Sequence, residues 1–181
     1  MKRCEWCTGS ELYMDYHDNE WGLPVFDDQK HFEFLVLESA QAGLSWITIL
    51  KKRENYRKAY DNFDPKKVAN YGEAKKKKLL LDTGIVRNKL KIEASITNAQ
   101  KFLEIQKEYG SFTKYIWSFT NGMPIIGKWN SINEIPAKTE LSDKISLDLK
   151  KKGFKFLGSI IMYSHLQATG IVNDHTKDCF R

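Results

Sequence analysis

Residues His31 to Leu50 read HFEFLVLESAQAGLSWITIL, and apolar side chains recur through this stretch at the spacing of an α-helix. Such periodicity predicts a helix with one face turned toward a core. Gly43 and Leu44 interrupt the run just before Ser45, a residue type that suits the N-cap of a new helix. The stretch therefore predicts helix on both sides of a break at Gly43 and Leu44.

Helical patterns continue through the rest of the chain. We expect further helices over 56–60, 66–71, 73–81, 87–109, 112–120, 142–152 and 159–169. Ser142 is expected to cap its helix, residues 123–137 to form a loop, and residues 154–157 to carry the main strand signal. A short tail helix is expected to hold His175 and Cys179. Without repeats or composition shifts, the sequence predicts an all-α fold in a single globular unit over 1–181.

The composition is that of a globular protein, with 41% hydrophobic and 29% charged residues. No stretch approaches the ~20 apolar residues that span a bilayer. The N-terminal residues are not followed by the apolar segment of a secretory signal, so we expect no membrane association and a cytoplasmic location.

The formal net charge of +6 favours a polyanionic partner, either nucleic acid or an acidic surface. Lysine and arginine residues fall in four runs, at 51–53, 66–67, 75–78 and 150–152. Any single run is explained well by a solvated helix face or a helix C-terminus, where cations offset the helix dipole. Four runs in one chain raise the expectation of nucleic-acid binding without deciding between DNA and RNA.

Three cysteines in a chain of this kind argue against a disulfide framework. Cys4, His17, His175 and Cys179 offer the donor set of a closed structural zinc site, which leaves no position open for a water molecule. Most of the chain separates the two pairs, and a lone histidine or cysteine is more often an ordinary packed residue. Cys7 could also replace one histidine, because Cys4-x2-Cys7 has metal-ligand spacing. His31 and His165 lie within apolar helical patterns, which favours a structural role for them.

Glu38 is unusual in its sequence context. It follows four apolar residues and shares a helical face with Leu35, Ala42 and Trp46. A carboxylate on an apolar face must find partners or take up a proton. The alternative is a glutamate near a helix end that reaches solvent or caps a backbone amide.

The chain closely resembles the 3-methyladenine DNA glycosylase I family, within the helix-hairpin-helix glycosylase superfamily. The resemblance covers essentially the whole sequence and rests on motifs in order: Cys4, YHDNEWG (16–22), Glu38, QAGLSWITILKKRE (41–54), GFKFLG (153–158) and NDHxxxC (173–179). It implies an all-α, helix-hairpin-helix glycosylase-like fold with one structural zinc ion that joins the N- and C-terminal segments. The implied ligands are Cys4, His17, His175 and Cys179, with Cys7 outside the set.

The resemblance also implies an enzyme of base-excision repair. Its substrate would be double-stranded DNA with alkylated bases, from which it would hydrolyse the N-glycosidic bond of 3-methyladenine without cleaving the strand. Glu38 matches the carboxylate that recognises the flipped base, whether by recognition alone or also by activating water. The aromatic residues that match the family's pocket are Trp6, Tyr13, Tyr16 and Trp46, with Trp21 less clearly placed. The aspartate that other superfamily members use has no counterpart that we can place.

Two segments are expected to contact DNA. Residues 73–98 would form the helix-hairpin-helix element, with Gly84 in its turn and Lys89 and Lys91 adding charge, although Val86 stands where a second glycine is usual. A simple pair of helices explains this segment about equally well. Gly43 and Leu44 match the family's wedge, which fills the gap left by the flipped nucleotide.

Two other functions compete with this interpretation. A zinc-dependent hydrolase would need an exchangeable position on the metal. A non-catalytic, zinc-stabilised basic nucleic-acid-binding module would bind damaged and undamaged DNA alike, but it has no need of a buried carboxylate. For the glycosylase we expect a monomer.

Overall fold

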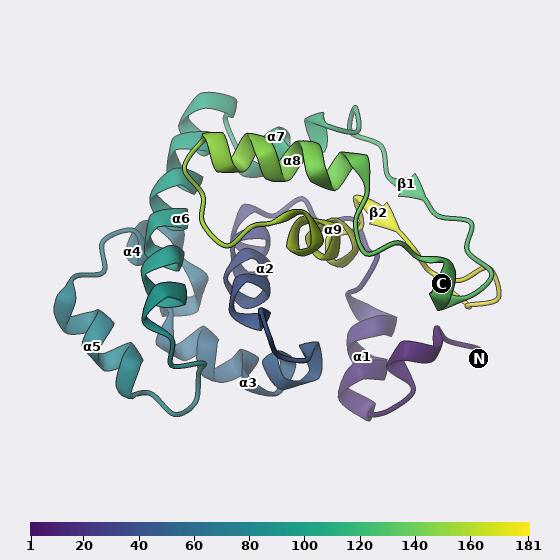
Figure 1. The fold of residues 1–181 in the computed structure, drawn as a ribbon, viewed down its shortest axis with the longest axis horizontal. Helices are drawn as coiled ribbons and strands as arrows, with labels where there is room; N and C mark the ends of the chain where they lie inside the picture. The colour runs from purple at the N-terminus through teal and green to yellow at the C-terminus, as the bar shows by residue number, and fades with distance from the viewer.

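The computed structural model describes all 181 residues, and most of them are helical (Figure 1). The helices are α1 (Glu11–Asn19), α2 (Asp28–Gln41), α3 (Trp46–Ala59), α4 (Pro65–Val68), α5 (Glu73–Leu81), α6 (Lys89–Tyr109), α7 (Phe112–Ser118), α8 (Glu140–Lys151) and α9 (Ser159–Ala168). Short 3₁₀ turns cover Glu5–Cys7, Asp61–Phe63 and Ile132–Glu134. The strands are β1 (Ile125–Ile126) and β2 (Val172–Asn173). None of the helices combines the length and the apolar character that crossing a membrane requires.

Helix α2 runs through the middle of the molecule, where it contacts α3, α6, α7 and α9 (Figure 1). Every residue from His31 to Ala40 is buried, so the helix is enclosed on all sides, as its apolar sequence requires. Asp27 caps its start by accepting a hydrogen bond from the amide of Lys30, at 2.7 Å. Gly43, with a φ of +81°, follows its end and turns the chain toward α3.

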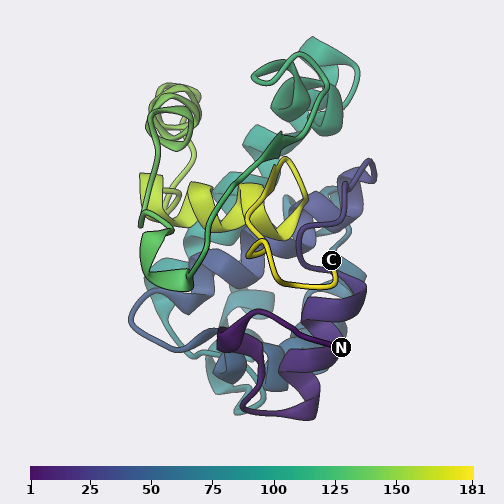
Figure 2. The ribbon, with the colours of Figure 1, turned by 90° about the vertical axis from the view of Figure 1, so that its right-hand side faces the viewer.

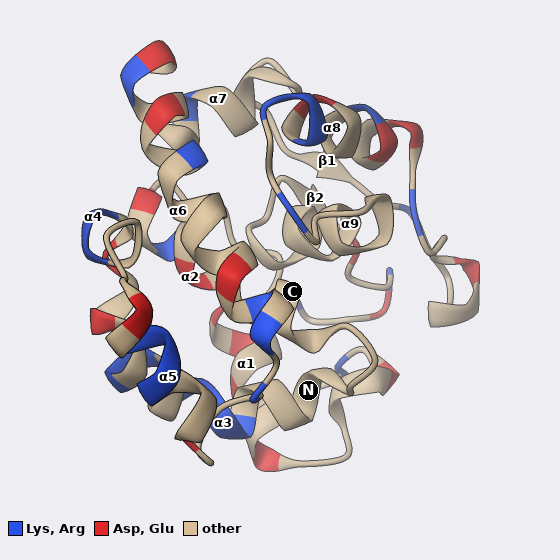
Figure 3. Ribbon diagram, turned by 60° about the vertical axis from the view of Figure 1, so that its left-hand side comes forward, with Lys and Arg blue, Asp and Glu red and all other residues tan.

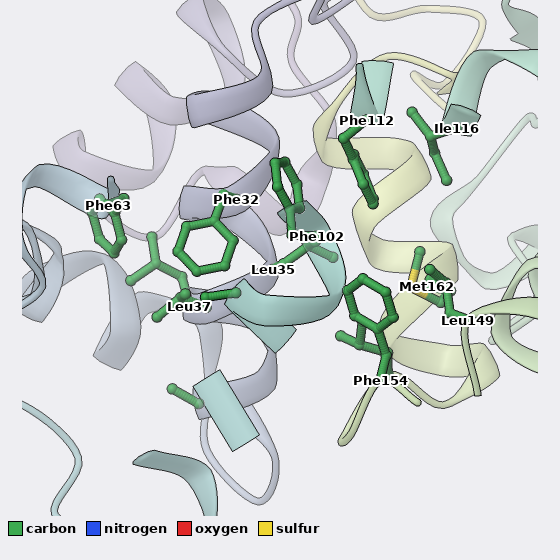
Figure 4. Packing of buried hydrophobic residues seen from close by; sticks show 14 of the residues in the cluster. Phe32, Leu35, Leu37, Phe63, Phe102, Phe112, Ile116, Leu149, Phe154 and Met162 are labelled. Carbon is green, nitrogen blue, oxygen red and sulfur yellow. The ribbon is translucent and has the colours of Figure 1, made fainter. Parts of the chain in front are cut away.

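The core lies on both sides of α2. Phe32, Leu35 and Leu37 of this helix pack among apolar side chains from α6, α7, α8 and α9 (Figure 4). The rings of Phe102 and Phe112 stack at 4.4 Å between centroids. Burial of so many large side chains around one helix fixes its position, and Glu38, on this helix, is held with it.

A partly buried ionic cluster joins the end of α1 to α2 and α3. Arg53 of α3 makes a two-pronged contact with Glu20, at 2.7 and 2.8 Å, and donates to Glu33 of α2 at 2.8 Å. Arg57 and Lys30 complete the cluster around these two carboxylates. Such geometry fixes the relative positions of the three helices, which together form one side of the site described below.

Several expectations about local structure are wrong. Residues 56–60 are the end of α3 and its C-cap rather than a separate helix. The helix expected from 142 begins at Glu140, because Thr139 is its cap and exchanges hydrogen bonds with Ser142 in a capping box. Residues 154–157 form no strand, and no tail helix holds His175 and Cys179.

The extended structure lies instead where the sequence predicted loop and tail. β1 and β2 pair in parallel, with Ile125 opposite Val172. The amide of Gly127 donates to the carbonyl of Asn173 at 2.8 Å. This short pair makes the fold mostly helical rather than wholly so, and it fastens the loop after α7 to the C-terminal segment.

Candidate active site

The four predicted metal ligands meet where the two ends of the chain lie side by side (Figure 2). Cys4 precedes the first 3₁₀ turn, His17 lies on α1, and His175 and Cys179 flank a turn after β2. All four ligand atoms lie within 4.8 Å of one another. The amide of Phe180 also donates to the carbonyl of Lys2 at 3.0 Å, which pairs the two terminal segments directly.

The spacing of these atoms fits a tetrahedral ion. The Sγ atom of Cys179 is 3.4 Å from His17 Nε2 and 3.5 Å from His175 Nδ1, and Cys4 Sγ is 3.7 Å from His175 Nδ1. In a tetrahedral zinc site, with Zn–S of about 2.3 Å and Zn–N of about 2.0–2.1 Å, neighbouring sulfur and nitrogen atoms are about 3.6 Å apart. The four side chains can therefore hold one small ion of this type.

Outer hydrogen bonds orient both histidines toward that position. His17 Nδ1 bonds Asp18 Oδ1 at 2.8 Å, and Arg3 in turn grips Asp18 through two nitrogens. His175 Nε2 donates to the carbonyl of Trp21 at 3.1 Å. Partners of this kind fix the ring orientation of metal-binding histidines. Cys7 is buried but lies outside the group, and its thiol donates to the carbonyl of Cys4 at 3.1 Å.

Gly22 leaves the space that the His175 ring occupies. It has a φ of +77°, and an added Cβ atom would lie 2.7 Å from His175 Nε2. We expect Gly22→Ala to displace this ring, lower bound metal below one ion per chain and lower the melting temperature by several degrees, given ~1–2 kcal/mol for the left-handed backbone alone. Elemental analysis and thermal unfolding would measure both effects. Gly9→Ala is the matched control, because a Cβ atom there meets nothing within 4 Å, and equal behaviour of the two variants would contradict the assignment.

A cavity of about 370 Å³ lies beside this cluster. That volume is in the range of small-molecule sites, ~300–1,000 Å³. Its walls come from the N-terminal segment, α1, α2, the start of α3, residues 132–137 and α9. The residues that line it are Trp6, Tyr16, Trp21, Glu38, Gln41, Trp46, Ile132, Ile135, Pro136, Ala137, Ile160, Tyr163, Ser164, Gln167 and Ala168. The cavity is thus an aromatic and aliphatic pocket with one carboxyl group.

Glu38 does not reach solvent, since only 2% of the residue is exposed. Its Oε2 atom bonds His165 Nδ1 at 2.9 Å, and its Oε1 atom has no hydrogen-bond partner. Burial raises the pKa of this carboxyl well above its ordinary value. The helix-end alternative for Glu38 is therefore wrong. The carboxyl group is buried, as its apolar neighbours predicted, but only Leu35 shares its helix, because α2 ends at Gln41, Ala42 is its exposed C-cap and Trp46 lies on α3.

A second buried polar atom in the pocket also has no hydrogen-bond partner. This atom is Trp46 Nε1, a donor, whereas Glu38 Oε1 is an acceptor. Buried polar groups are nearly always paired in native proteins, so an unpaired acceptor and an unpaired donor in one aromatic pocket indicate a ligand that supplies both complements. The edge of a nucleobase has this character.

Three of the four predicted pocket aromatics line the cavity, namely Trp6, Tyr16 and Trp46, and so does Trp21. Tyr13 lies behind them. Its ring meets Trp6 edge-on at 5.5 Å, and its hydroxyl accepts a hydrogen bond from the amide of Ile47 at 2.9 Å. In this structure Tyr13 anchors the start of α3 instead of lining the cavity.

Sequence reasoning missed two parts of the site. Residues 132–137 form one wall, but their loop has no periodicity that points to a pocket. The other is His165, which bonds Glu38 directly and contacts His31 at 3.1 Å between ring nitrogens. Both histidines sit on apolar helical faces, as the sequence indicated, but so does Glu38. The shared apolar setting of His31, His165 and Glu38 was the signal in the sequence that could have linked these three residues.

The predicted DNA-contact residues are arranged in two groups. Gly43 and Leu44 form an exposed corner just past the end of α2, separated from Gln41 by Ala42, and 41% of Leu44 is accessible. Gly84 lies in the connection between α5 and α6, where a Cβ atom would lie 2.9 Å from Asn55. Its small size is required there by this close approach.

The two predicted lysines differ in their surroundings. Lys89 is exposed at the start of α6. The ammonium of Lys91 instead donates to the carbonyls of Ala40 and Ala42, at 2.8 and 2.7 Å. Lys91 therefore ties α6 to the end of α2, next to the exposed corner, and its charge is partly used in the fold. Further basic residues gather on α3 and α5 (Figure 3).

A second pair of helices is joined by a short loop beside the pocket. α8 and α9 are joined by residues 152–158, in which Gly153 has a φ of +95° and Phe156 and Lys155 are exposed. Gly158 occupies the N-cap of α9 without a side-chain cap. The first residues of α9 therefore present backbone amides near Ile160, which lines the cavity.

Comparison with known proteins identifies the family to which a chain with this site is similar. Residues 6–181 match the model of the family described as methyladenine glycosylase. The chain is 49% identical to DNA-3-methyladenine glycosylase 1 of Escherichia coli, over 99% of this chain and 96% of that protein. It is 45% identical to DNA-3-methyladenine glycosylase of Haemophilus influenzae, over 98% and 96% of the two chains.

Solved structures agree with this relationship. A crystal structure of 3-methyladenine DNA glycosylase I matches with a TM-score of 0.96 at 49% identity, covering 99% of this chain and 98% of the other. The Staphylococcus aureus enzyme, whose structure concerns 3-methyladenine recognition, matches with a TM-score of 0.95 at 40% identity, over 99% and 95%. The chain therefore belongs to the methyladenine glycosylase family.

Proposed function

We propose that the chain is a monofunctional DNA glycosylase of base-excision repair, which hydrolyses the N-glycosidic bond of 3-methyladenine in alkylated double-stranded DNA. Membership of the family and the character of the pocket support this activity. The observation that carries the proposal is that one aromatic cavity holds both a buried acceptor, Glu38 Oε1, and a buried donor, Trp46 Nε1, that lack hydrogen-bond partners. No groove-binding module needs such a site.

Glu38 would read the flipped base. Methylation at N3 makes the adenine ring cationic and turns it into a good leaving group. The faces of Trp6, Tyr16 and Trp46 attract a cationic ring more strongly than a neutral one. Glu38 Oε1 can accept from the exocyclic amine and would reject guanine, whose O6 atom is also an acceptor. Binding the cation in this pocket places the bond to be broken where water can attack the sugar.

A structural zinc ion would hold the pocket together from outside. Two thiolates and two imidazoles suit zinc, and four protein ligands leave no open position for a reacting water. Held by such an ion, the terminal segments press Trp6 and α1 against the helix that carries Glu38. All steps at the base are therefore assigned to Glu38 and its aromatic neighbours, and the ion supports their positions.

The DNA would lie across the face that carries the exposed corner at Gly43 and Leu44, the connection between α5 and α6, and the connection between α8 and α9. Leu44 at the corner is two residues from Trp46 of the pocket, which suits a wedge that fills the space of the flipped nucleotide. The starts of α6 and α9, with Lys89 and Lys155, offer amides and charge for phosphates on either side. Lys91 would act by holding the corner in place.

One chain contains the whole pocket, which supports action as a monomer. None of the three cysteines forms a disulfide, which suits a reducing compartment and supports a cytoplasmic location.

Truncation of the wedge tests the arrangement. Leu44→Ala should lower excision from duplex DNA by about tenfold or more, because unstacking and flipping cost a few kcal/mol that the wedge helps to supply. Binding of free 3-methyladenine should not change, since Leu44 does not line the cavity. Single-turnover excision and equilibrium binding measure the two effects. A parallel fall in both would place Leu44 in the pocket instead of at a wedge.

The activity itself is tested by chromatography of bases released from methylated duplex DNA. We expect 3-methyladenine above its spontaneous release, no cleavage of the strand, and release that a chelator does not stop in protein that remains folded. Binding without release would indicate a non-catalytic module. Reversible loss of release on chelation, with the fold intact, would indicate a metal-dependent hydrolase.

A further inference from the structure

A chain of buried hydrogen bonds extends from the pocket into the core. Glu38 Oε2 bonds His165 Nδ1 at 2.9 Å, His165 Nε2 bonds His31 Nδ1 at 3.1 Å, and His31 Nε2 bonds the carbonyl of Val25 at 3.1 Å. Both histidines are fully buried, and Glu38 is 2% exposed. The three side chains of this hydrogen-bond chain are therefore shielded from water.

The Val25 end of this hydrogen-bond chain determines which atoms of His31, His165 and Glu38 carry hydrogen. The Val25 carbonyl can only accept, so His31 Nε2 carries hydrogen, and a neutral His31 must then accept at Nδ1. His165 Nε2 is therefore the donor to His31, and a neutral His165 must accept at Nδ1. The group that donates to His165 Nδ1 is Glu38, as a carboxylic acid. The same geometry also holds if this one proton sits on His165 and Glu38 is a carboxylate.

Both arrangements have zero net charge, which suits a dry site. Burial lowers the pKa of His31 and of His165 to about 3, so the hydrogen-bonded group of Glu38, His165 and His31 takes up no second proton at neutral pH. Burial raises the pKa of Glu38, so the chain does not lose its one proton readily either. Across the neutral range the Glu38–His165 pair holds a single proton.

The surroundings leave this balance intact. The titratable groups that face the chain are Tyr16 of α1, beside Glu38, and Asp27 and Asp28 at the start of α2, beside His31. Asp28 already accepts from the amides of Phe112 and Thr113 at the start of α7. The core residues that α7, α8 and α9 contribute are mostly apolar, and the two tyrosines among them, Tyr115 and Tyr163, donate their hydroxyls to Asp148 and Asp174.

We propose that His165, oriented by His31, is a positioning residue that stores the proton of Glu38 while a cationic base occupies the pocket. The inference rests on the proposed function, because it concerns the same carboxyl group. With the pocket free, Glu38 is the acid and His165 the acceptor. When a cationic base donates to Oε1, the Oε2–H bond breaks, the Nδ1–H bond of His165 forms, and Glu38 becomes a carboxylate. On release of the base the proton returns.

This exchange makes the carboxylate available without a proton leaving the protein. A buried carboxyl group with no such partner would have to release its proton to solvent before binding a cation. Its function would then rise about tenfold per pH unit until the pKa of the carboxyl group is passed. With His165 in place, excision should be nearly independent of pH in the neutral range.

The pH profile of single-turnover excision from methylated duplex DNA tests the inference. Between pH 6 and 8 we expect the wild-type rate to vary by less than about twofold and that of His165→Phe to rise about tenfold per unit. Leu166→Ala is the matched control, because Leu166 is fully buried beside His165 on the same helix and lies outside the pocket. It should lower the melting temperature and keep the flat profile.

The outcomes separate the two claims. A wild-type protein that releases no 3-methyladenine would overturn the proposed function. Wild-type excision together with a flat profile for His165→Phe would overturn the proton-storing role alone.

A measurement on the wild-type protein removes any dependence on the folding of the variant. Histidine labelled with ¹⁵N reports the protonation of each ring nitrogen. Addition of adenine methylated at both N3 and N9, a permanent cation, should move the His165 Nδ1 signal to the protonated range and leave His31 Nδ1 unprotonated. An unchanged His165 signal at saturation would overturn the proposal.

Discussion

Glu38→Gln should lose at least about 10²-fold of 3-methyladenine excision, the scale on which a single preorganised electrostatic contact acts in an active site. Glutamine keeps the shape of the side chain but cannot become anionic, so the pocket loses its attraction for a cationic base. Its amide can also present a donor toward the exocyclic amine. The loss should appear in the single-turnover rate, while melting temperature and metal content stay near those of the wild type.

The charge change itself needs a control. Glu104→Gln removes an exposed carboxylate from α6, where its partner is Lys101, and should leave excision unchanged. Glu38→Gln with full excision would remove Glu38 from the reaction. A variant that also lost its metal or its fold would show that the role of Glu38 is structural.

Cys179→Ser should remove one of the four proposed metal ligands, Cys4, His17, His175 and Cys179, that join the two ends of the chain. The cysteine lies closest to both histidines of the group, and serine is a poor ligand for a soft metal site. Structural zinc sites bind with ~10–16 kcal/mol in small domains. In this larger fold we expect a loss of at least about 3 kcal/mol of stability, which lowers the melting temperature by roughly 6–12 °C. Bound zinc should fall well below one ion per chain.

Cys7→Ser is the matched control for this variant. Cys7 is fully buried, more so than Cys179, and lies three residues from Cys4, but its thiol only donates to a backbone carbonyl. It should keep its zinc. The fraction of Cys179→Ser that stays folded should still excise 3-methyladenine, because none of the four proposed metal ligands lines the pocket. Wild-type zinc content in Cys179→Ser, or its loss in Cys7→Ser, would contradict the ligand set.

Local signals in the sequence were sufficient where one interaction dominates. The run EAKKKKLLL predicts a helix over 73–81, and α5 has those bounds. The break at Gly43 was also visible, because its positive φ is a property of one residue. At the start of α8 two caps competed, and Thr139 prevailed because Ser142 could return the hydrogen bond from inside the helix.

Features that depend on long-range pairing were not predictable from the sequence. β1 and β2 have two residues each and pair only because the fold brings together two segments that are far apart in the sequence. The turn that holds His175 and Cys179 has no periodicity of its own, and its shape is set by contacts with Cys4 and Trp21. The resemblance supplied the ligand set, whereas spacing alone left Cys7 as a rival.

The pocket divides in the same way. Glu38 is identifiable as a carboxyl group on an apolar helical face, and the structure places it in the cavity. His165 lies 127 positions away on another helix, so only the packing of α9 against α2 brings the two together. Tyr13 matched the family's pocket, yet the turn of α1 directs its hydroxyl to the backbone of α3.

The central claim is that Glu38 Oε1 is the atom that recognises the alkylated base. A crystal structure of the wild-type protein with free 3-methyladenine tests it most directly. We predict that the base lies among Trp6, Tyr16 and Trp46, with its exocyclic amine about 3 Å from Oε1, the distance of an ordinary hydrogen bond. A base bound at saturation elsewhere, or in the cavity with no contact to Glu38, would contradict the account.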